Sequence, residues 1–307
     1  MTPGLVGVDW GTTNRRAYRL DGAGVCVAEH ADADGLLAAR GRFAQSLDVA
    51  LAALGVEDPG MRVVMSGMVG SASGWVEAPY LDLSTPLDEL SSHLVPVPGA
   101  NRRCYIVPGY CQRSRNAADV MRGEETQLLG ALALGCGDGW FVLPGTHSKW
   151  VQLRGGRIDA FTTYMTGELF DLLARLGTLA DAAGPDGETS AAAFLDGVRA
   201  EPDAALSHAL FGCRARVVAG IMPAAQAHSY LSGLLIGAEW HDVRRRCGGR
   251  LPSRLTLIGS AKLAARYGAV AAALDVVVDV LDPRAAYLAA LAALEAQPAS
   301  TLLPASP

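Results

Sequence analysis

Two stretches that lie almost half a chain apart follow the same plan. The first is GTTNRRAYRLDG, from Gly11 to Gly22, and the second is GTHSKWVQLRGG, from Gly145 to Gly156. Each begins with Gly-Thr, continues through two polar residues and a basic residue, and then reads as a strand that ends in a glycine turn. An apolar strand precedes each copy, LVGVD in the first and WFVLP in the second. The repeat predicts two similar domains, each built around a strand–turn–strand hairpin.

The rest of the chain alternates short apolar segments with segments of helical periodicity, which predicts an α/β fold. The predicted strands are 5–9, 16–20, 25–29, 62–65, 105–107, 140–143, 150–153, 158–164, 255–258 and 276–280. The predicted helices are 43–54, 124–134, 167–176, 190–198, 223–246, 261–267 and 283–296. In the last two helices, Ser260 is predicted as an N-cap and Pro283 as a first-turn residue.

The chain of 307 residues is long enough for two domains of ordinary size. We place the first domain at 1–118, completed by the helix at 283–297, and the second domain at 119–282. The Pro/Ala/Ser-rich tail at 298–307 is expected to fray.

Composition excludes several classes of partner. A net charge of −5 without a stripe of lysine and arginine argues against a nucleic-acid partner. The six cysteines are scattered and form no CxxC pair, which is typical of a protein in a reducing compartment. No uncharged apolar run approaches the ~20 residues that span a bilayer. We expect a cytoplasmic protein without a membrane partner; its oligomeric state is open, and a homodimer is one option.

The first hairpin places an acid where its apolar strand should continue. Asp9 ends the strand, and the turn that follows contains Gly11, Thr12, Thr13 and Asn14. Amides of glycine and threonine in a tight turn can form a nest for an anion. A carboxylate beside phosphates suits Mg²⁺, which needs only one or two protein carboxylates. The segment therefore predicts a phosphate site with Asp9 as metal ligand, although a plain hairpin turn explains it equally well.

The second hairpin offers the same chemistry. Its predicted nucleotide contacts are Gly145, Thr146, His147 and Lys149. Two opposed turns of this kind could hold Mg-ATP in a cleft between the two domains. Arg16 and Lys149, which follow the two turns, could counter phosphate charge or form structural ion pairs.

A third segment, LTLIGSAKLAARYG, joins a strand to a helix through a Gly-Ser turn. Because the N-terminus of a helix favours anions, Gly259 and Ser260 could contact adenosine or the α-phosphate. A plain strand-to-helix connection explains the segment equally well.

Several longer stretches resemble one family of kinases. These are SGMVGSASGWVEAPYL (66–81), DVMRGEETQLLGA (119–131), LPGTHSKWVQ (143–152), TYMTGELFDLL (163–173) and YLSGLLIGAEW (230–240). They resemble the 2-dehydro-3-deoxygalactonokinase family, within the actin–sugar kinase–Hsp70 superfamily. The resemblance implies two ribonuclease-H-like (actin-like ATPase) domains with an interdomain cleft. It also implies ATP-dependent phosphorylation of the C6 hydroxyl of 2-dehydro-3-deoxy-D-galactonate.

Phosphoryl transfer to a hydroxyl needs a group that accepts the hydroxyl proton. The resemblance implies an acidic residue at the helix that begins with GEETQ, where Glu124 and Glu125 stand side by side. Neighbouring helix residues point about 100° apart, so only one can face the site. We predict Glu124 as the base, with Glu125 and Asp119 as alternatives. Acids also stabilise a helix N-terminus, which explains one of the pair without catalysis.

The carboxylate of a sugar acid calls for a cation, and arginine binds carboxylates with two parallel hydrogen bonds. The candidates for binding this carboxylate are Arg15, Arg16 and Arg122. The resemblance further implies that the Gly/Ser loop before Trp75 and the TYMTGE segment line the substrate pocket. The other predicted substrate contacts are Arg15, Gly67, Ser71, Trp75, Arg122, Thr166 and Glu168.

Two other functions stay open at this point. One is a polyphosphate or guanosine-pentaphosphate phosphatase of the same superfamily, which uses water as its nucleophile. The other is a non-catalytic, actin-like nucleotide switch. No G-x-G-x-x-G follows the first strand and no Walker A string occurs, which argues against a dehydrogenase and a P-loop enzyme.

Overall fold

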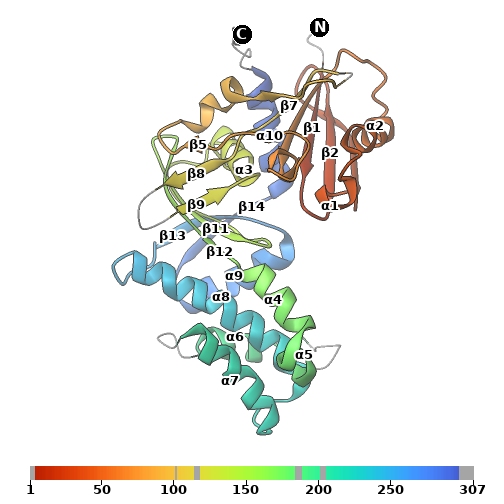
Figure 1. Ribbon diagram of the computed structural model, residues 1–307. Helices are drawn as coiled ribbons and strands as arrows, with labels where there is room; N and C mark the ends of the chain where they lie inside the picture. The colour runs from red at the N-terminus through yellow and green to blue at the C-terminus, as the bar shows by residue number, and fades with distance from the viewer. Residues whose placement is uncertain (1–3, 101, 114–117, 184–188, 201–204, 297–307) are drawn as a thin grey trace. The chain divides into compact units, whose positions relative to one another are not determined.

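The computed structural model describes residues 4–100, 102–113, 118–183, 189–200 and 205–296 (Figure 1). The chain forms two compact units. Unit 1 contains the described residues up to Asp138, the segment Val151–Phe161 and those from Leu281 on; unit 2 contains Gly139–Trp150 and Thr162–Val280. The predicted tail at 298–307 lies outside the described residues. The domain limits expected at 118 and 282 stay a prediction.

Unit 1 holds a six-stranded sheet of order β3-β2-β1-β4-β7-β6 and a three-stranded sheet of order β5-β8-β9. Its strands are β1 (Leu5–Trp10), β2 (Arg15–Leu20), β3 (Cys26–Asp32), β4 (Arg62–Gly67), β5 (Leu81–Asp82), β6 (Val95–Pro96), β7 (Cys104–Ile106), β8 (Tyr110–Arg113) and β9 (Ala118–Met121). Its helices are α1 (Leu36–Ala39), α2 (Phe43–Ala53), α3 (Glu124–Ala133) and α10 (Pro283–Ala296), with 3₁₀ turns η1 (Met68–Gly70) and η2 (Leu87–His93).

The core of unit 1 is built on alternate residues of β1. Val6, Val8 and Trp10 point to one face of the sheet, where they join a buried cluster that includes Phe43 and Leu47 of α2. On the other face, Gly7 leaves room for the side chain of Leu291 on α10, because a Cβ on Gly7 would lie 2.1 Å from Leu291 Cδ1. Asp9 shares this second face by the period of the strand.

Unit 2 holds most of a five-stranded sheet of order β12-β11-β10-β13-β14. The strands of this sheet are β10 (Gly139–Leu143), β11 (Ser148–Arg154), β12 (Arg157–Tyr164), β13 (Arg254–Ile258) and β14 (Val277–Leu281). The parts of β11 and β12 within Val151–Phe161, and Leu281 of β14, belong to unit 1. The helices of unit 2 are α4 (Thr166–Arg175), α5 (Gly177–Ala183), α6 (Ala191–Val198), α7 (Leu206–Val218), α8 (Ala227–Arg246) and α9 (Ala261–Ala273), with the 3₁₀ turn η3 (Ala224–Gln226).

The strand orders of the two sheets repeat one another. In the first, the segment β3-β2-β1 is followed by β4, which runs parallel to β1. In the second, β12-β11-β10 is followed by β13, which runs parallel to β10. The repeat of the two hairpins in the sequence therefore extends to the strand order of the two sheets. The predicted α/β class is confirmed.

Several elements were not predicted. Helices α5 and α7 and the small sheet β5-β8-β9 are additional, and α9 continues past the predicted end at Tyr267 to Ala273. Ser260 stands at the N-cap of α9 as predicted, yet within the described residues its side chain makes no capping hydrogen bond. Pro283 begins α10, as predicted.

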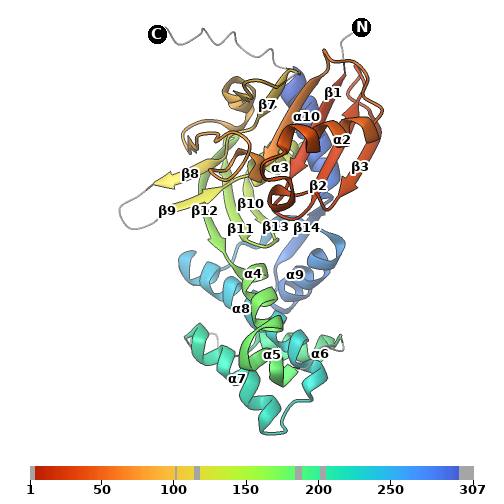
Figure 2. The same cartoon turned by 45° about the vertical axis from the view of Figure 1, so that its right-hand side comes forward.

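Helix α3 lies along α10 within unit 1 (Figures 1 and 2), and a glycine permits this contact. A Cβ on Gly130 would lie 1.7 Å from the carbonyl oxygen of Ala286. No side-chain rotation can relieve a clash with backbone, so the two helices would have to move apart.

We therefore expect Gly130→Ala to lower the free energy of unfolding by about 3 kcal/mol and the melting temperature by about 6 °C or more. The matched control is Gly268→Ala on α9, where an added Cβ meets no atom of the described residues within 4 Å. It should leave the melting temperature unchanged or raise it, since alanine favours helix. Equal melting temperatures for the two variants, measured by circular dichroism, would contradict this account of the α3–α10 contact.

Candidate active site

Asp9 lies at the carboxyl end of β1, between β2 and β4. It pairs across the antiparallel register with Arg16 and across the parallel register with Ser66. Arg16 Nη1 lies 3.5 Å from Asp9 Oδ2, and the Asp9 side chain is 27% exposed. Burial raises the pKa of Asp9, and the charge of Glu124 adds to this, whereas Arg16 lowers the pKa. A further cation beside Asp9 would therefore stabilise its charged form.

Two glycines bring the start of α3 to the end of β1. Gly67, at the end of β4, has φ +86, and a Cβ there would lie 2.8 Å from Trp10 O and 3.6 Å from Asp9 Oδ1. Gly123, just before α3, has φ +111, and its Cβ would lie 3.3 Å from the Cα of Gly67. Side chains at either position would be strained and would separate the segments. The contact joins the VDWG, MSGM and RGEE segments at one point.

The adjacent acids of α3 have different surroundings. Glu124 is half-buried and accepts a hydrogen bond of 3.0 Å from the Arg122 N–H. Glu125 is 0% exposed and accepts hydrogen bonds from Gly123 N–H at 2.7 Å and from Thr126 Oγ1 at 3.1 Å. Burial, and then the charge of Glu124, raise the pKa of Glu125 to about 7. Of the two, Glu124 is the one that a ligand can reach.

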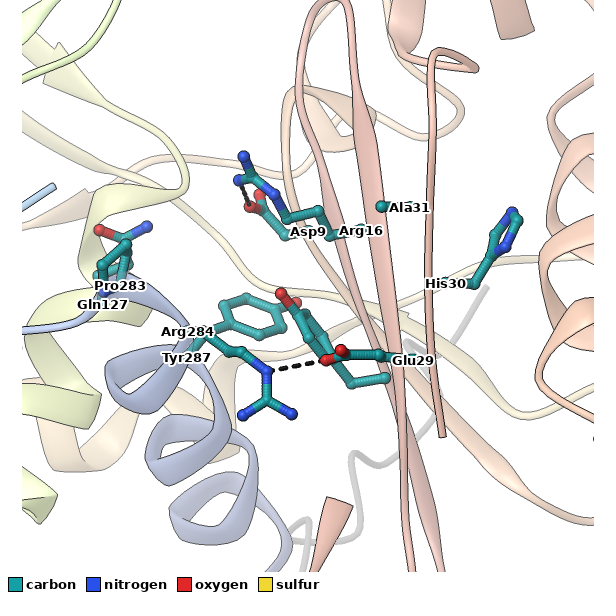
Figure 3. Close-up of a pocket in the computed structure, with 10 residues that line it drawn as sticks. Asp9, Arg16, Glu29, His30, Ala31, Gln127, Pro283, Arg284 and Tyr287 are labelled. Carbon is teal, nitrogen blue, oxygen red and sulfur yellow. Dashed lines mark hydrogen bonds and ion pairs between the residues drawn. The ribbon is translucent and has the colours of Figure 1, made fainter. Parts of the chain in front are cut away.

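Asp9 and Arg16 line a cavity of about 440 Å³ within unit 1 (Figure 3). Its other lining residues are Tyr18, Glu29, His30, Ala31, Gln127, Pro283, Arg284 and Tyr287. Arg284 Nε donates to Glu29 Oε2 at 2.8 Å, and the rings of Tyr18 and Tyr287 are 5.5 Å apart. The sequence analysis missed Gln127 and Arg284. The position of Gln127 three residues after Glu124 on one helix was a usable signal.

The turn after β1 is anchored through its carbonyl groups. Gly11 N–H donates to Asn14 O at 2.9 Å, and the carbonyls of Gly11 and Thr12 accept from the N–H groups of Leu36 and Leu37. Thr12, Thr13 and Asn14 are exposed. The turn is thus held from one side and open to a ligand on the other.

The two buried or half-buried arginine candidates are held by protein contacts. Arg15 is 1% exposed, donates to Ser46 and pairs with Asp32 at 2.6 Å. This placement argues against Arg15 as a substrate ligand. Arg122 donates from Nη2 to Ala78 O at 2.8 Å, and its guanidinium lies over the Tyr80 ring. Arg16, 59% exposed, is the most accessible of the three.

The residues of the Gly/Ser loop do not all lie beside Asp9. Gly67 adjoins Asp9, whereas Ser71 donates from Oγ to Met68 O at 2.8 Å within the loop. The Trp75 ring stacks on Phe43, with centroids 6.2 Å apart. Trp75 lines a second cavity of about 560 Å³ beside the start of α2, and not the cavity of Asp9.

In unit 2, the turn between β10 and β11 rests on the start of α4. A Cβ on Gly167 would lie 2.2 Å from Gly145 O, so only glycine allows this approach. Glu168 N–H donates to Thr146 O at 2.9 Å, and Glu168 Oε2 lies 2.6 Å from His147 Nε2. The backbone and the side chain of Glu168 therefore both contact the turn. Lys149 follows on β11 with its side chain buried.

A buried carboxylate that the sequence analysis missed lies behind this turn. Glu239 of α8 is 2% exposed and accepts hydrogen bonds from Ser148 Oγ at 2.8 Å and Trp150 Nε1 at 2.5 Å. It also accepts from Thr166 Oγ1 at 2.5 Å and from the Tyr267 hydroxyl at 2.9 Å. The Thr166 hydroxyl is thus committed to Glu239, which argues against Thr166 as a sugar contact. A lone acid in the apolar helix LSGLLIGAEW was the available signal.

The strand-to-helix connection at Gly259 adjoins the same turn. Because β10 and β13 run parallel, their carboxyl ends lie together. A Cβ on Gly259 would lie 3.0 Å from Pro144 Cγ. Gly259 and Ser260 are thus brought beside the segment that begins at Gly145.

The family of this chain follows from its similarity to known proteins. The family model described as 2-keto-3-deoxy-galactonokinase matches residues 9–294. The chain belongs to this family. It is 42% identical over 239 residues to the Rhizobium meliloti protein named "Probable 2-dehydro-3-deoxygalactonokinase", covering 76% of this chain and 78% of the relative. It is 38% identical over 268 residues to the Escherichia coli 2-dehydro-3-deoxygalactonokinase, covering 87% and 89%.

A solved structure supports the same family. The crystal structure of a Sinorhizobium meliloti protein described as a 2-dehydro-3-deoxygalactonokinase has 37% identity and a TM-score of 0.87, covering 94% of this chain and 95% of that chain. The 2-keto-3-deoxy-galactonokinase family, with its actin-like ATPase fold, implies ATP use and a sugar-acid substrate. These findings support the kinase and not the phosphatase or the nucleotide switch.

Within the described ranges, no helix is long and apolar enough to cross a membrane. In the same part of the chain, no group of three or more His, Cys, Asp or Glu side chains could hold a metal ion.

Glu125 makes the stability of the protein depend on pH. Its folded-state pKa of about 7 exceeds the ordinary glutamate value, so the stability it contributes is present at low pH and lost as pH rises through about 7. We expect the wild-type free energy of unfolding to fall by up to ~3 kcal/mol between pH 4.5 and 8, relative to Glu125→Gln. Urea titrations of both proteins across this range measure the difference. A constant difference would contradict the raised pKa.

Proposed function

We propose that this protein transfers the γ-phosphoryl group of ATP to the C6 hydroxyl of 2-dehydro-3-deoxy-D-galactonate and releases ADP. Membership of the 2-keto-3-deoxy-galactonokinase family supports the substrate class. The observation that carries the chemistry is the Gly67–Gly123 contact, which joins Asp9 and Glu124 at the end of a core strand. Phosphoryl transfer needs such a concentration of positioned charge.

Asp9 is the proposed Mg²⁺ ligand. The fit rests on its hard oxygen donors, its partial exposure and the raised pKa that a nearby cation would lower again. Mg²⁺ keeps several water ligands, so one or two protein carboxylates suffice. When bound, the ion would neutralise phosphate charge.

Glu124 is the proposed base, and it accepts the proton of the attacking hydroxyl. Its position at the first turn of α3 and its partial exposure favour it over the fully buried Glu125. Arg16 and the exposed turn of Gly11, Thr12, Thr13 and Asn14 would contact phosphate. Gln127 lines the cavity of Asp9 and is a further candidate there.

The turn of unit 2 is proposed as a second phosphate contact. Its N–H groups at Gly145, Thr146 and His147 would bind the nucleotide, with Lys149 as counter-charge and Gly259 and Ser260 beside the nucleoside. On the substrate side, Gly67 is favoured by its place next to Asp9. Ser71, Trp75, Arg122 and Glu168 stay predictions, as do the cytoplasmic location, a homodimer and the lack of a nucleic-acid or membrane partner.

The proposed reaction is tested by ADP release, coupled to pyruvate kinase and lactate dehydrogenase, over a panel of 2-keto-3-deoxy sugar acids, aldoses and buffer alone. We expect ADP only with the sugar acids, and fastest with the galactonate derivative. Mass spectrometry of the product should show one added phosphoryl group at C6. Equal ADP release with and without sugar would instead indicate a hydrolase.

The assignment of the base is tested with the neighbouring pair of acids. Glu124→Gln should lower kcat by about 10²- to 10⁴-fold, because the amide cannot accept a proton. Binding of a non-hydrolysable ATP analogue, measured by calorimetry, should be unchanged. Glu125→Gln is the matched control, and its kcat should stay near that of the wild type. A larger loss in Glu125→Gln would show that the base is the other acid.

A further inference from the structure

The network around Glu239 lies apart from the proposed chemistry, yet it connects three elements that lie near the turn of unit 2. Glu239 is on α8, and its four donors come from three other elements. Ser148 and Trp150 belong to β11, Thr166 to α4 and Tyr267 to α9. One carboxylate therefore fixes three separate segments of unit 2.

Two of these segments adjoin the Gly145–His147 turn, and the third begins beside Pro144, the residue before the turn. Ser148 is the next residue after the turn, and its hydroxyl is fully buried against Glu239. Thr166 immediately precedes Gly167, the residue that packs on Gly145 O. Tyr267 lies on α9, whose first residues follow Gly259, in contact with Pro144. The network thus links segments that lie near the turn.

A hydrophobic residue of similar size would fill the same space but could not select these positions. Each donor O–H or N–H must point at one of two oxygens, so the carboxylate fixes orientation as well as distance. Hydrogen bonds to a carboxylate contribute more than neutral ones, and an unsatisfied buried partner is costly. The arrangement therefore suits an acceptor with two oxygens, which the carboxyl group of Glu239 provides.

We propose that Glu239 is a positioning residue for the nucleotide, which holds the Gly145–His147 turn in the conformation that binds phosphate. This inference rests on the proposed function of that turn. Glu239 would touch neither ATP nor the sugar acid. Its removal should weaken ATP binding and leave the transfer step itself almost intact.

The test compares Glu239→Gln with Asp242→Asn. Glutamine keeps the size of the side chain but replaces one acceptor oxygen with an amide that donates. Asp242 is on the same helix, accepts a hydrogen bond from Tyr164 and pairs with Arg245 and Arg246. It controls for the loss of a carboxylate from α8.

We expect Glu239→Gln to raise KM for ATP and the Kd of an ATP analogue about tenfold or more, the effect of leaving a buried donor without its acceptor. The kcat at saturating ATP and KM for the sugar acid should change little, and Asp242→Asn should match the wild type. A lower melting temperature with unchanged ATP affinity would overturn the proposal. So would a fall in kcat with no change in KM for ATP.

Single-donor variants keep the test decisive if Glu239→Gln does not fold. Thr166→Val and Tyr267→Phe each remove one donor and leave the carboxylate in place. Each should raise the Kd of the ATP analogue by a smaller factor, and the double variant by the larger one. Wild-type affinity in all three would overturn the proposal. Calorimetry needs no turnover, so a wild-type protein without kinase activity would reject the proposed reaction and leave this test valid.

Discussion

The charge of Asp9 at the end of a buried strand is the constraint around which unit 1 is arranged. A carboxylate in this position is unfavourable unless cations or donors surround it, because burial disfavours the charged form. The antiparallel register supplies Arg16 opposite Asp9, and the parallel register brings the end of β4 beside it. Gly67 and Gly123 then let α3 begin at the same point. The position of Glu124 near Asp9 follows from the close approach of these two glycines.

The two sheets share a strand order and one way of holding their hairpin turns, a backbone hydrogen bond from the helix that packs on each turn. In unit 1 the turn after β1 is held by backbone hydrogen bonds to Leu36 and Leu37. In unit 2 the corresponding turn accepts a backbone hydrogen bond from Glu168 N–H at Thr146 O, and Glu239 bonds neighbouring residues on β11, α4 and α9. A hairpin that binds a ligand must be ordered before the ligand arrives, or the ordering entropy weakens binding. The shared topology therefore comes with a shared backbone contact at Thr12 and Thr146, and unit 2 adds a buried carboxyl group.

The sequence predicted what is local and missed what depends on contacts between distant residues. Strand β1, its turn and Asp9 follow from an apolar run that ends in an acid, and α3 follows from helical periodicity. The burial of Arg15 could not be read in this way, because Asp32 and Ser46 become its partners only when β2 packs beside β3 and α2. Glu239 was missed for the same reason, since its four donors are between 28 and 91 residues away in sequence.

Glu124 and Glu125 show why residue type at one place in a motif does not determine a role. Both stand in the first turn of α3, where an acid is favourable beside the helix N-terminus. Glu125 points inward, is bonded to the Gly123 N–H and Thr126, and has a pKa near that of a catalytic base. Yet a base must reach the hydroxyl it deprotonates, and a side chain with no exposed surface cannot do so without movement of α3. Access therefore outweighs the pKa in this choice, and it favours the half-buried Glu124 beside Asp9.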